Sequence, residues 1–282
     1  AGLLPVVSCA AVSYGEFLAI RGRGAKEVIL SAVFSIAPAL AVSIVLGYAA
    51  PLEACVACLA GVAVAGFLAK RAMSTSTGII TVTALSLALM GCDAIVAWLS
   101  GTTLPQIAED LVAAYESSLG DLSVDTAAQV SSMLSMYKSL WPMSYVSMGL
   151  AEFCIAWLGV QTATRRLRLP STALPHLVDY DAPLWATALL VLGLLGLTAG
   201  SVVSSSTELV AQVSLNVVMS LRVIFAIQGL AVLTWFFREK RMGSFASTVF
   251  TLLALYLELQ FYIMTIVGLV DVWRNFRHLP RG

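Results

Sequence analysis

Charged residues inside long apolar runs are the first sign of chemistry in this chain of 282 residues. Arg222, Glu258 and Glu152 each lie near the middle of such a run. A charge at the centre of a lipid bilayer costs at least about 2.5 kcal/mol on insertion scales, so each of these residues is a candidate functional group. Two carboxylates facing one guanidinium would leave a negative charge or a shared proton. Either arrangement suits the binding of a cationic or polar solute.

The spacing of Arg222 and Glu258 predicts that they pair. Counted from the turn centred near Met242, Arg222 lies about 20 residues back and Glu258 about 16 residues forward, so their depths differ by roughly 6 Å. We therefore expect an ion pair across adjacent antiparallel helices, with Glu152 at a similar depth. The alternative is a structural ion pair that only fixes helix register.

Two further polar residues are less central candidates for contacts with a solute. Asp93 lies about two turns from the outer end of its apolar run, and Gln228 follows Arg222 on the same run. Arg222 and Gln228 are separated by about 600° of helical rotation, so their side chains are expected to face different directions.

Composition identifies the elements that must position these residues. Hydrophobic residues make up 59% of the chain and charged residues 11%, compared with roughly 25% charged in a soluble domain. Several apolar stretches are long enough to cross a hydrocarbon core of about 30 Å as helices. We predict an all-α, polytopic transmembrane bundle that forms a single integral membrane domain over residues 1–282. The formal net charge of +0 indicates no nucleic-acid partner.

Apolar windows of about 20 residues predict eight spans and their orientation. The windows are 1–20, 28–49, 52–69, 78–100, 141–163, 184–203, 208–237 and 245–270. The first window shows no cleavable signal pattern with a basic front end, so we expect residues 1–20 to be a span. The basic clusters all fall on one side, which the positive-inside rule makes cytoplasmic. Both termini are then expected on the outer side. We expect the protein itself to lie in the cytoplasmic membrane of a bacterium.

The basic tail conflicts with this orientation, because Arg274, Arg277 and Arg281 would lie on the outer side. Trp273 and Phe276 lie between them. Two interpretations stay open: an amphipathic helix in the membrane interface, or a frayed end whose aromatic rings anchor at the headgroups.

The predicted outer segment 101–140 is too long for a simple turn. Its apolar residues recur at helical spacing, which predicts two amphipathic helices, 105–119 and 124–139, separated at Gly120 and Asp121. This pair would be either a lid over a cavity or a packed cap.

Small residues form two strips at a spacing of four. One contains Ala11, Gly15 and Ala19, and the other contains Ala57, Gly61, Ala65 and Ala69. Such strips allow helix backbones to approach closely in lipid. Two interpretations stay open: both strips pack the protein's own bundle, or the first strip docks another membrane subunit.

Motifs for cofactors and catalysis are missing from the sequence. All five cysteines lie in apolar runs, and the Cys55/Cys58 pair has no second pair with which to complete a metal site. Phosphate-binding, zinc-hydrolase, nucleophile-elbow and dinucleotide patterns are not found. We expect no metal, no cofactor and no enzymatic activity.

The C-terminal part of the chain carries a family resemblance. From Arg222 it contains R-V-I-F-A-I-Q-G-L-A-V-L-T-W-F-F-R-E-K-R-M-G, then a long apolar run, then G-L-V-D-V-W-R-N-F-R. This part resembles the YybS-like family of bacterial multi-pass membrane proteins. That family is remotely similar to the S subunits of energy-coupling-factor vitamin transporters and to the scaffold protein MreD. In S subunits, small residues of the first helix contact the coupling subunit, a role that the resemblance implies for Ala11, Gly15 and Ala19.

Two functions follow as hypotheses. The first is a subunit that binds or transports a small, vitamin- or precursor-like solute, with energy from a partner ATPase or an ion gradient. Its pocket would lie beneath the outer helices, with Glu152, Arg222 and Glu258 at the floor. The second is a non-transporting scaffold or assembly factor for envelope or division machinery, and a membrane enzyme is a more distant third. Partners would be the bilayer, a coupling subunit or envelope proteins.

Overall fold

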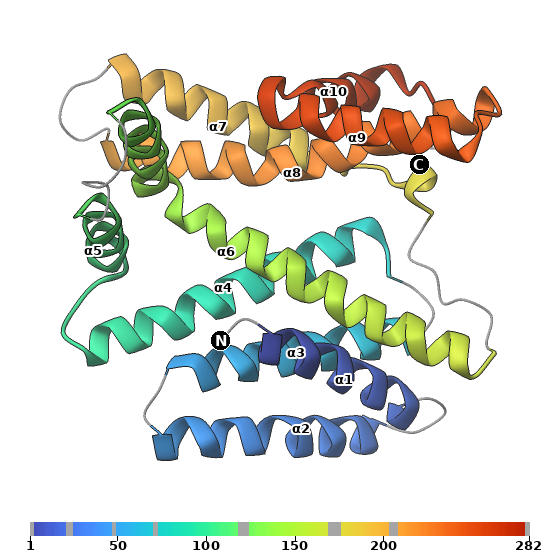
Figure 1. Ribbon diagram of the computed structural model, residues 1–282. Coiled ribbons are helices and arrows are strands. Elements are labelled where there is room, and N and C mark those ends of the chain that lie inside the picture. The colour runs from blue at the N-terminus through green and yellow to red at the C-terminus, as the bar shows by residue number, and fades with distance from the viewer. Residues whose placement is uncertain are drawn as a thin grey trace. The chain divides into compact units, whose positions relative to one another are not determined.

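A computed structural model describes residues 3–20, 25–46, 49–69, 73–117, 124–168, 176–202 and 208–279, which form two compact units. The first unit contains α1 (Leu3–Ile20), α2 (Ala25–Leu46), α3 (Ala49–Ala69), α4 (Thr75–Leu99), α5 (Leu104–Ser117) and α6 (Val124–Arg166) (Figure 1). The second contains the short 3-10 helix η2 (Leu177–Asp179), α7 (Leu184–Val202), α8 (Glu208–Glu239), α9 (Ser244–Phe261) and α10 (Ile263–Arg274). All regular elements in these ranges are helices, so the predicted all-α membrane class is confirmed.

A described apolar helix lies in or overlaps each predicted span. Four described helices are long and apolar enough to cross a membrane, and they lie in α4, α6, α8 and α9. Shorter apolar helices in α1, α2, α3 and α7 lie within the other four predicted windows. The positions of the apolar elements therefore agree with the sequence, while eight crossings stay a prediction.

Close backbone contacts join α1, α3 and α6 in the first unit. A methyl group added to Gly61 of α3 would lie 3.0 Å from the backbone nitrogen of Ser13 on α1. A methyl group added to Gly159 of α6 would collide with Ala10 on α1. Ala57 and Ala65 are fully buried on the same face of α3 as Gly61. The strip on α3 thus packs the protein's own bundle, as small residues do where lipid gives helices no hydrophobic drive to associate.

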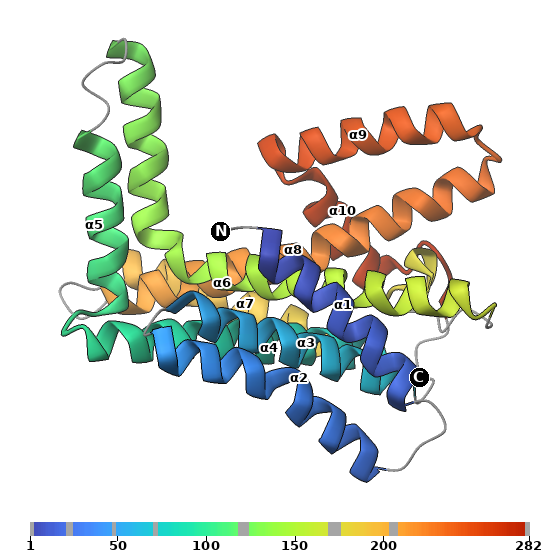
Figure 2. The same ribbon diagram turned by 60° about the horizontal axis from the view of Figure 1, so that its bottom comes forward.

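The outer segment differs from its prediction in the extent of its second helix. Helix α5 matches the first predicted amphipathic helix, but the second (124–139) and the predicted span 141–163 form the single helix α6 of 43 residues. Pro142 lies inside α6, and proline removes one backbone hydrogen bond and bends a helix without ending it. Figure 2 shows the first part of α6, beside α5, at an angle to the rest. The predicted break at Gly120 and Asp121 lies outside the described residues.

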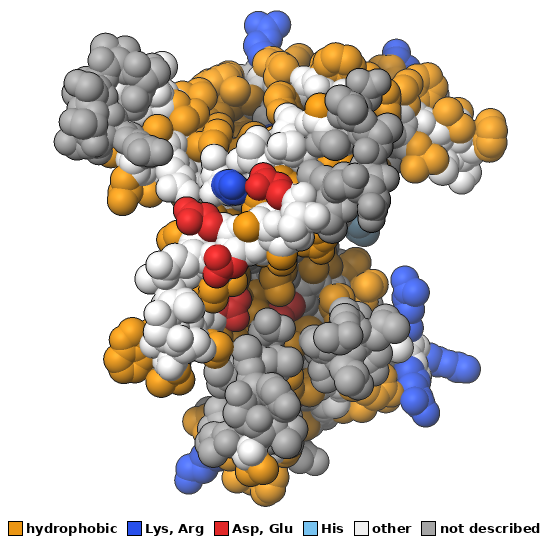
Figure 3. Space-filling view, turned by 60° about the vertical axis from the view of Figure 1, so that its left-hand side comes forward, with side chains coloured by type: hydrophobic (Ala, Val, Ile, Leu, Met, Phe, Trp, Pro, Cys, Tyr) orange, Lys and Arg blue, Asp and Glu red, His pale blue; other side chains and the backbone are white. Residues whose placement is uncertain are grey.

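The apolar residues that recur every four positions in the first outer helix are not its buried ones. Ala108 and Val112 are buried, whereas Ile107, Leu111 and Tyr115 are between 44% and 57% exposed. Figure 3 shows acidic side chains gathered around one basic side chain over α5 and the start of α6. This part of the chain therefore presents an acidic surface and exposed apolar side chains together.

Helices α7 and α8 form the antiparallel centre of the second unit. Ala186 and Leu190 of α7 pack with Leu221 and Phe225 of α8, and Val272 of α10 joins the same buried cluster. Burial of these side chains fixes α10 against the α7–α8 pair.

The last predicted span, 245–270, is not one helix. Tyr262 adopts a left-handed conformation (φ 58°) between α9 and α10. Figure 2 shows α9 lying back along α8 and α10 turning from the end of α9 toward α8. A methyl group added to Gly268 of α10 would collide with the Phe225 carbonyl of α8, and one added to Gly229 with the Met264 carbonyl. The glycines permit this approach, which apolar content and length alone could not reveal.

Candidate functional site

Arg222 and Glu258 pair in the second unit, as their spacing predicted. Arg222 Nε donates to Glu258 Oε1 at 2.9 Å, and Arg222 Nη2 donates to the Glu258 backbone carbonyl at 2.9 Å. The guanidinium also lies over the ring of Tyr262, 3.9 Å from its centroid. One arginine therefore binds a carboxylate, a carbonyl and an aromatic face, all at the junction of α9 and α10.

Thr265 occupies the remaining positions on the Glu258 carboxylate. Its hydroxyl donates to Oε1 at 2.7 Å and its backbone N–H donates to Oε2 at 2.9 Å. Thr265 is the third residue of α10, where a helix has a free N–H and favours negative charge. Glu258, from the last turn of α9, therefore caps the start of α10 and stabilises the break at Tyr262.

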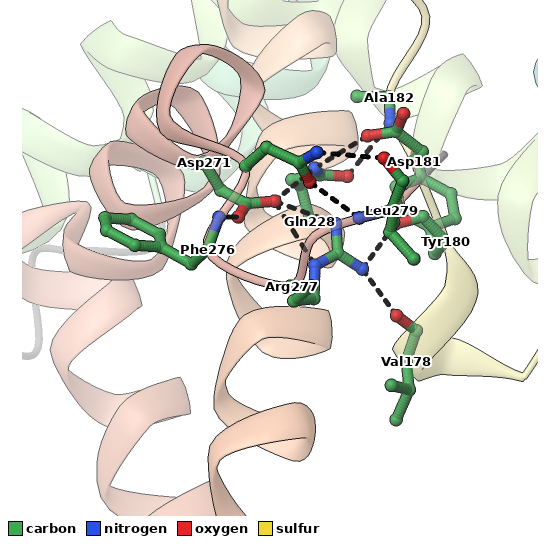
Figure 4. Close-up of polar contacts among 10 residues, drawn as sticks. Val178, Tyr180, Asp181, Ala182, Gln228, Asp271, Phe276, Arg277 and Leu279 are labelled. Carbon is green, nitrogen blue, oxygen red and sulfur yellow. Dashed lines mark hydrogen bonds and ion pairs between the residues drawn. The ribbon is translucent and has the colours of Figure 1, made fainter. Parts of the chain in front are cut away.

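A second buried network closes the other end of α10 (Figure 4). Arg277 Nη2 and Nε donate to Asp271 Oδ2 at 2.8 and 3.2 Å, and neither side chain is exposed. Asp271 Oδ1 accepts the backbone N–H of Phe276 at 2.9 Å, just after the helix ends. Asp271 thus has the same double role as Glu258: it pairs with an arginine and satisfies a backbone group at a helix end.

The remaining bonds of this network fix the segment before α7. Arg277 Nη1 donates to the carbonyls of Val178 and Tyr180 at 2.6 and 2.7 Å. Gln228 is fully buried; it accepts the N–H of Ala182 at 2.9 Å and donates to Asp271 Oδ2 at 2.7 Å. Gln228 Nε2 also donates to Asp181 Oδ1 at 3.2 Å. Backbone groups of a non-helical segment thereby find partners inside the protein.

Burial also affects the phenol of Tyr180. Desolvation, with a smaller contribution from the neighbouring Asp181 carboxylate, raises the pKa of Tyr180 well above its usual value. Tyr180 is therefore neutral throughout the physiological pH range.

Both networks serve one physical need. In a bilayer, water does not satisfy free backbone groups, so irregular backbone is tolerated only where the protein itself supplies the partners. Each buried carboxylate here accepts a backbone N–H as well as an arginine. Each ion pair therefore also satisfies backbone groups at a helix end, as the structural alternative for Arg222 and Glu258 requires, and their contact with a solute stays a prediction.

The predicted solute-binding residues divide between the units. Gln228 belongs to the Asp271 network and not to the Arg222–Glu258 pair, in agreement with its predicted direction. Glu152 and Asp93 belong to the first unit. Cys9 Sγ of α1 donates to the Glu152 carbonyl at 3.5 Å, and Tyr145 donates to Asp93 Oδ2 at 2.8 Å. The structure brings Arg222 and Glu258 together and gives the other three residues separate surroundings.

The two small-residue strips also have different surroundings. The strip on α3 is packed against α1, but Ala11 and Gly15 are exposed and no side chain or distant backbone lies within 4 Å of a methyl group added to Gly15. Ala19 is half-buried. The strip on α1 thus faces away from the described neighbours of its own unit.

Asp271 and Arg277 were the residues missed as site elements. In the sequence, Asp271 directly follows the last predicted span and Arg277 belongs to the basic tail, whereas the structure buries both side chains. Asn275, which ends α10 in a left-handed conformation, is a signal that was available. It places the chain reversal between the aspartate and the arginine.

An apolar groove lies beside these networks in the second unit. It has a volume of about 320 Å³ and is lined by Gly229, Val232, Leu233 and Phe236 of α8, by Met264 and Val267 of α10, and by Phe276 among others. Its size is at the lower end of the range for small-molecule sites. Among the described residues, no cluster of three His, Cys, Asp or Glu side chains is suited to hold a metal ion.

Comparison with known proteins identifies the family. No curated protein and no solved structure matches the chain. A family model described as a predicted membrane protein matches residues 17–272, which include α7, α8, α9 and all but the last two residues of α10. The chain therefore belongs to the DUF2232 family of predicted membrane proteins.

Proposed function

We propose that this protein is a solute-binding or transport subunit whose ligand is largely apolar or amphipathic and binds in the α8–α10 groove. The groove itself carries this proposal, because aliphatic and aromatic side chains dominate its lining. Such a lining favours a ligand with a substantial hydrocarbon part. The resemblance of residues 222–277 to the YybS-like family, and more remotely to vitamin-binding S subunits, supports the same class of function.

The ion pairs act in this proposal through the position of α10. Arg222 and Glu258 hold its start, and Asp271 holds the backbone of Phe276, which lines the groove. They are positioning residues and are not expected to touch the ligand.

Filling the groove tests the proposal. Val232→Trp places a large ring in the groove, and Val249→Trp makes the same change on α9 at an exposed position outside the groove lining. Native mass spectrometry of gently purified protein should show a small molecule bound to the parent chain and to Val249→Trp, and lost from Val232→Trp. Retention by Val232→Trp, or equal loss from both variants, would overturn the assignment of this groove.

Glu152 and Asp93, in the first unit, stay candidates from the sequence for contacts with a polar solute, independently of the groove. Glu152→Gln removes the charge with little change in shape, so it should reduce the retained solute while leaving the folded protein intact. Unchanged retention would remove Glu152 from the site without affecting the groove.

A scaffold or assembly subunit is the second candidate, favoured by the exposed strip on α1. Gly15→Leu should abolish capture of a membrane partner, because the bulky side chain keeps a second helix from close approach. Gly66→Leu on α3 is the matched control, since a methyl group there also meets open space. Equal capture by both variants would argue against docking through α1.

A further inference from the structure

We infer that α9 and α10 form a re-entrant pair, so that the end of the described chain lies on the same side of the membrane as the start of α7. The predicted span 245–270 is long enough for one full crossing. The contacts of its two helices with α8 show that the chain turns back inside the bundle.

Contacts along α8 give the direction of each helix. Phe250 of α9 packs against Phe237, near the end of α8, and Glu258 later pairs with Arg222. Between these two contacts, α9 therefore runs antiparallel to α8 along a stretch of about 15 residues of α8, which is roughly 22 Å long.

Helix α10 reverses this path. Near its start, the Thr265 hydroxyl oxygen lies 3.5 Å from the Arg222 carbonyl oxygen, and near its end Asp271 accepts from Gln228. It therefore moves along α8 toward the end from which α9 came.

The tail then attaches to the segment that leads into α7. Arg277 binds the carbonyls of Val178 and Tyr180, only a few residues before α7 begins at Leu184. If α7 crosses the membrane, the tail must lie with its N-terminal end. The C-terminal end of α7, at Val202, then belongs to the opposite side.

This arrangement removes the conflict in the charge pattern. With eight crossings, Arg274, Arg277 and Arg281 are on the side that the positive-inside rule disfavours. With a re-entrant pair, they fall on the same side as the connection from α6 to α7, at whose α6 end the basic residues Arg165, Arg166 and Arg168 lie. All basic clusters then lie on the same side of the membrane. At the capped break near Tyr262, the protein itself supplies the hydrogen-bond partners that a turn within the membrane needs.

Site-directed labelling tests the inference. In a variant without the five native cysteines, single cysteines replace His278 in the tail, His176 before α7, or Ser205 between α7 and α8 in the sequence. The two histidines are exposed in the structure. A membrane-impermeant maleimide is then applied to intact cells and to inverted vesicles. We expect positions 278 and 176 to share one labelling pattern and position 205 to show the opposite one.

Other outcomes would overturn the inference. A tail that labels together with position 205 means that the α9–α10 pair crosses the membrane, and identical labelling of all three positions means that α7 does not cross. Arg274→Cys supplies a second exposed tail position. If removal of the native cysteines prevents folding, a green fluorescent protein fused after Gly282 of the unaltered chain gives an independent test. It should fluoresce as a cytoplasmic domain does. A fluorescent-protein fusion that stays dark, together with an active alkaline phosphatase fused at the same position, would contradict the inference.

Discussion

The two units use different means to bring helices together. In the first unit, α1, α3 and α6 approach through glycines and alanines, and the described ion pair, Lys138–Glu116, is exposed and 4.0 Å long. The second unit has close contacts at glycines as well, but adds two ion pairs of 2.8 and 2.9 Å that are buried or nearly so. Charges are therefore used where the backbone must turn.

The difference follows from what each unit requires of its backbone. A bundle of continuous helices satisfies its own N–H and C=O groups, so smooth surfaces are sufficient for packing. A helix that breaks at Tyr262 and a chain that turns at Asn275 leave backbone groups without helical partners. Glu258, Asp271, Gln228 and Arg277 supply those partners.

Removing Arg277 should break the second unit most severely. Arg277→Ala leaves the buried Asp271 carboxylate without its cation and two carbonyls without their donor, and we expect a loss of about 3–5 kcal/mol in unfolding free energy. Arg274→Ala, at an exposed position, should change it by less than about 0.5 kcal/mol. Denaturant unfolding in mild detergent measures both. Equal effects would refute the structural role of the Asp271 network.

A methyl group at Gly268 should have the next largest effect. Gly268→Ala pushes α10 against the Phe225 carbonyl, and such overpacking costs about 1–3 kcal/mol. Gly15→Ala meets open space and should be neutral or stabilise α1 by up to about 1 kcal/mol. The same unfolding measurement distinguishes them, and a tolerated alanine at Gly268 would contradict the close approach of α8 and α10.

Loss of the Thr265 hydroxyl should weaken the capped break more modestly. Thr265→Val keeps the backbone bond to Glu258 but removes the 2.7 Å side-chain bond, at a cost of about 1 kcal/mol. Thr248→Val on α9 removes only a bond to the preceding turn and is the control. Thermal unfolding should show a lower Tm for Thr265→Val alone; matching values would mean that this hydroxyl does not support the break.

The smallest effect is expected at the ion pair of the first unit. Lys138 and Glu116 are each about 40% exposed in their side chains, so Lys138→Ala should alter the unfolding free energy by less than about 0.5 kcal/mol. The difference in unfolding free energy between Lys138→Ala and the parent protein should also disappear at high salt, because solvent ions screen the pair. A loss above 1 kcal/mol would weaken the contrast between the units.

The sequence predicted the site in part. Helical spacing was sufficient to pair Arg222 with Glu258, because two antiparallel helices joined by a short turn fix the relative depth of their residues. It also indicated that Gln228 faces elsewhere. The partners of Gln228 could not be predicted, since they come from segments about 45 residues away on either side, and no local spacing relates them.

The sequence by itself determined the class and the elements: apolar content made the chain an all-α membrane protein, and hydropathy located its apolar helices, because lipid admits so few backbone conformations. Only the tertiary structure decided that the last apolar run breaks at Tyr262, that Asp271 and Arg277 turn inward, and that the α3 strip is buried while the α1 strip is exposed. These outcomes depend on which backbone groups need a partner and which surfaces meet, and both are properties of helices already placed against one another.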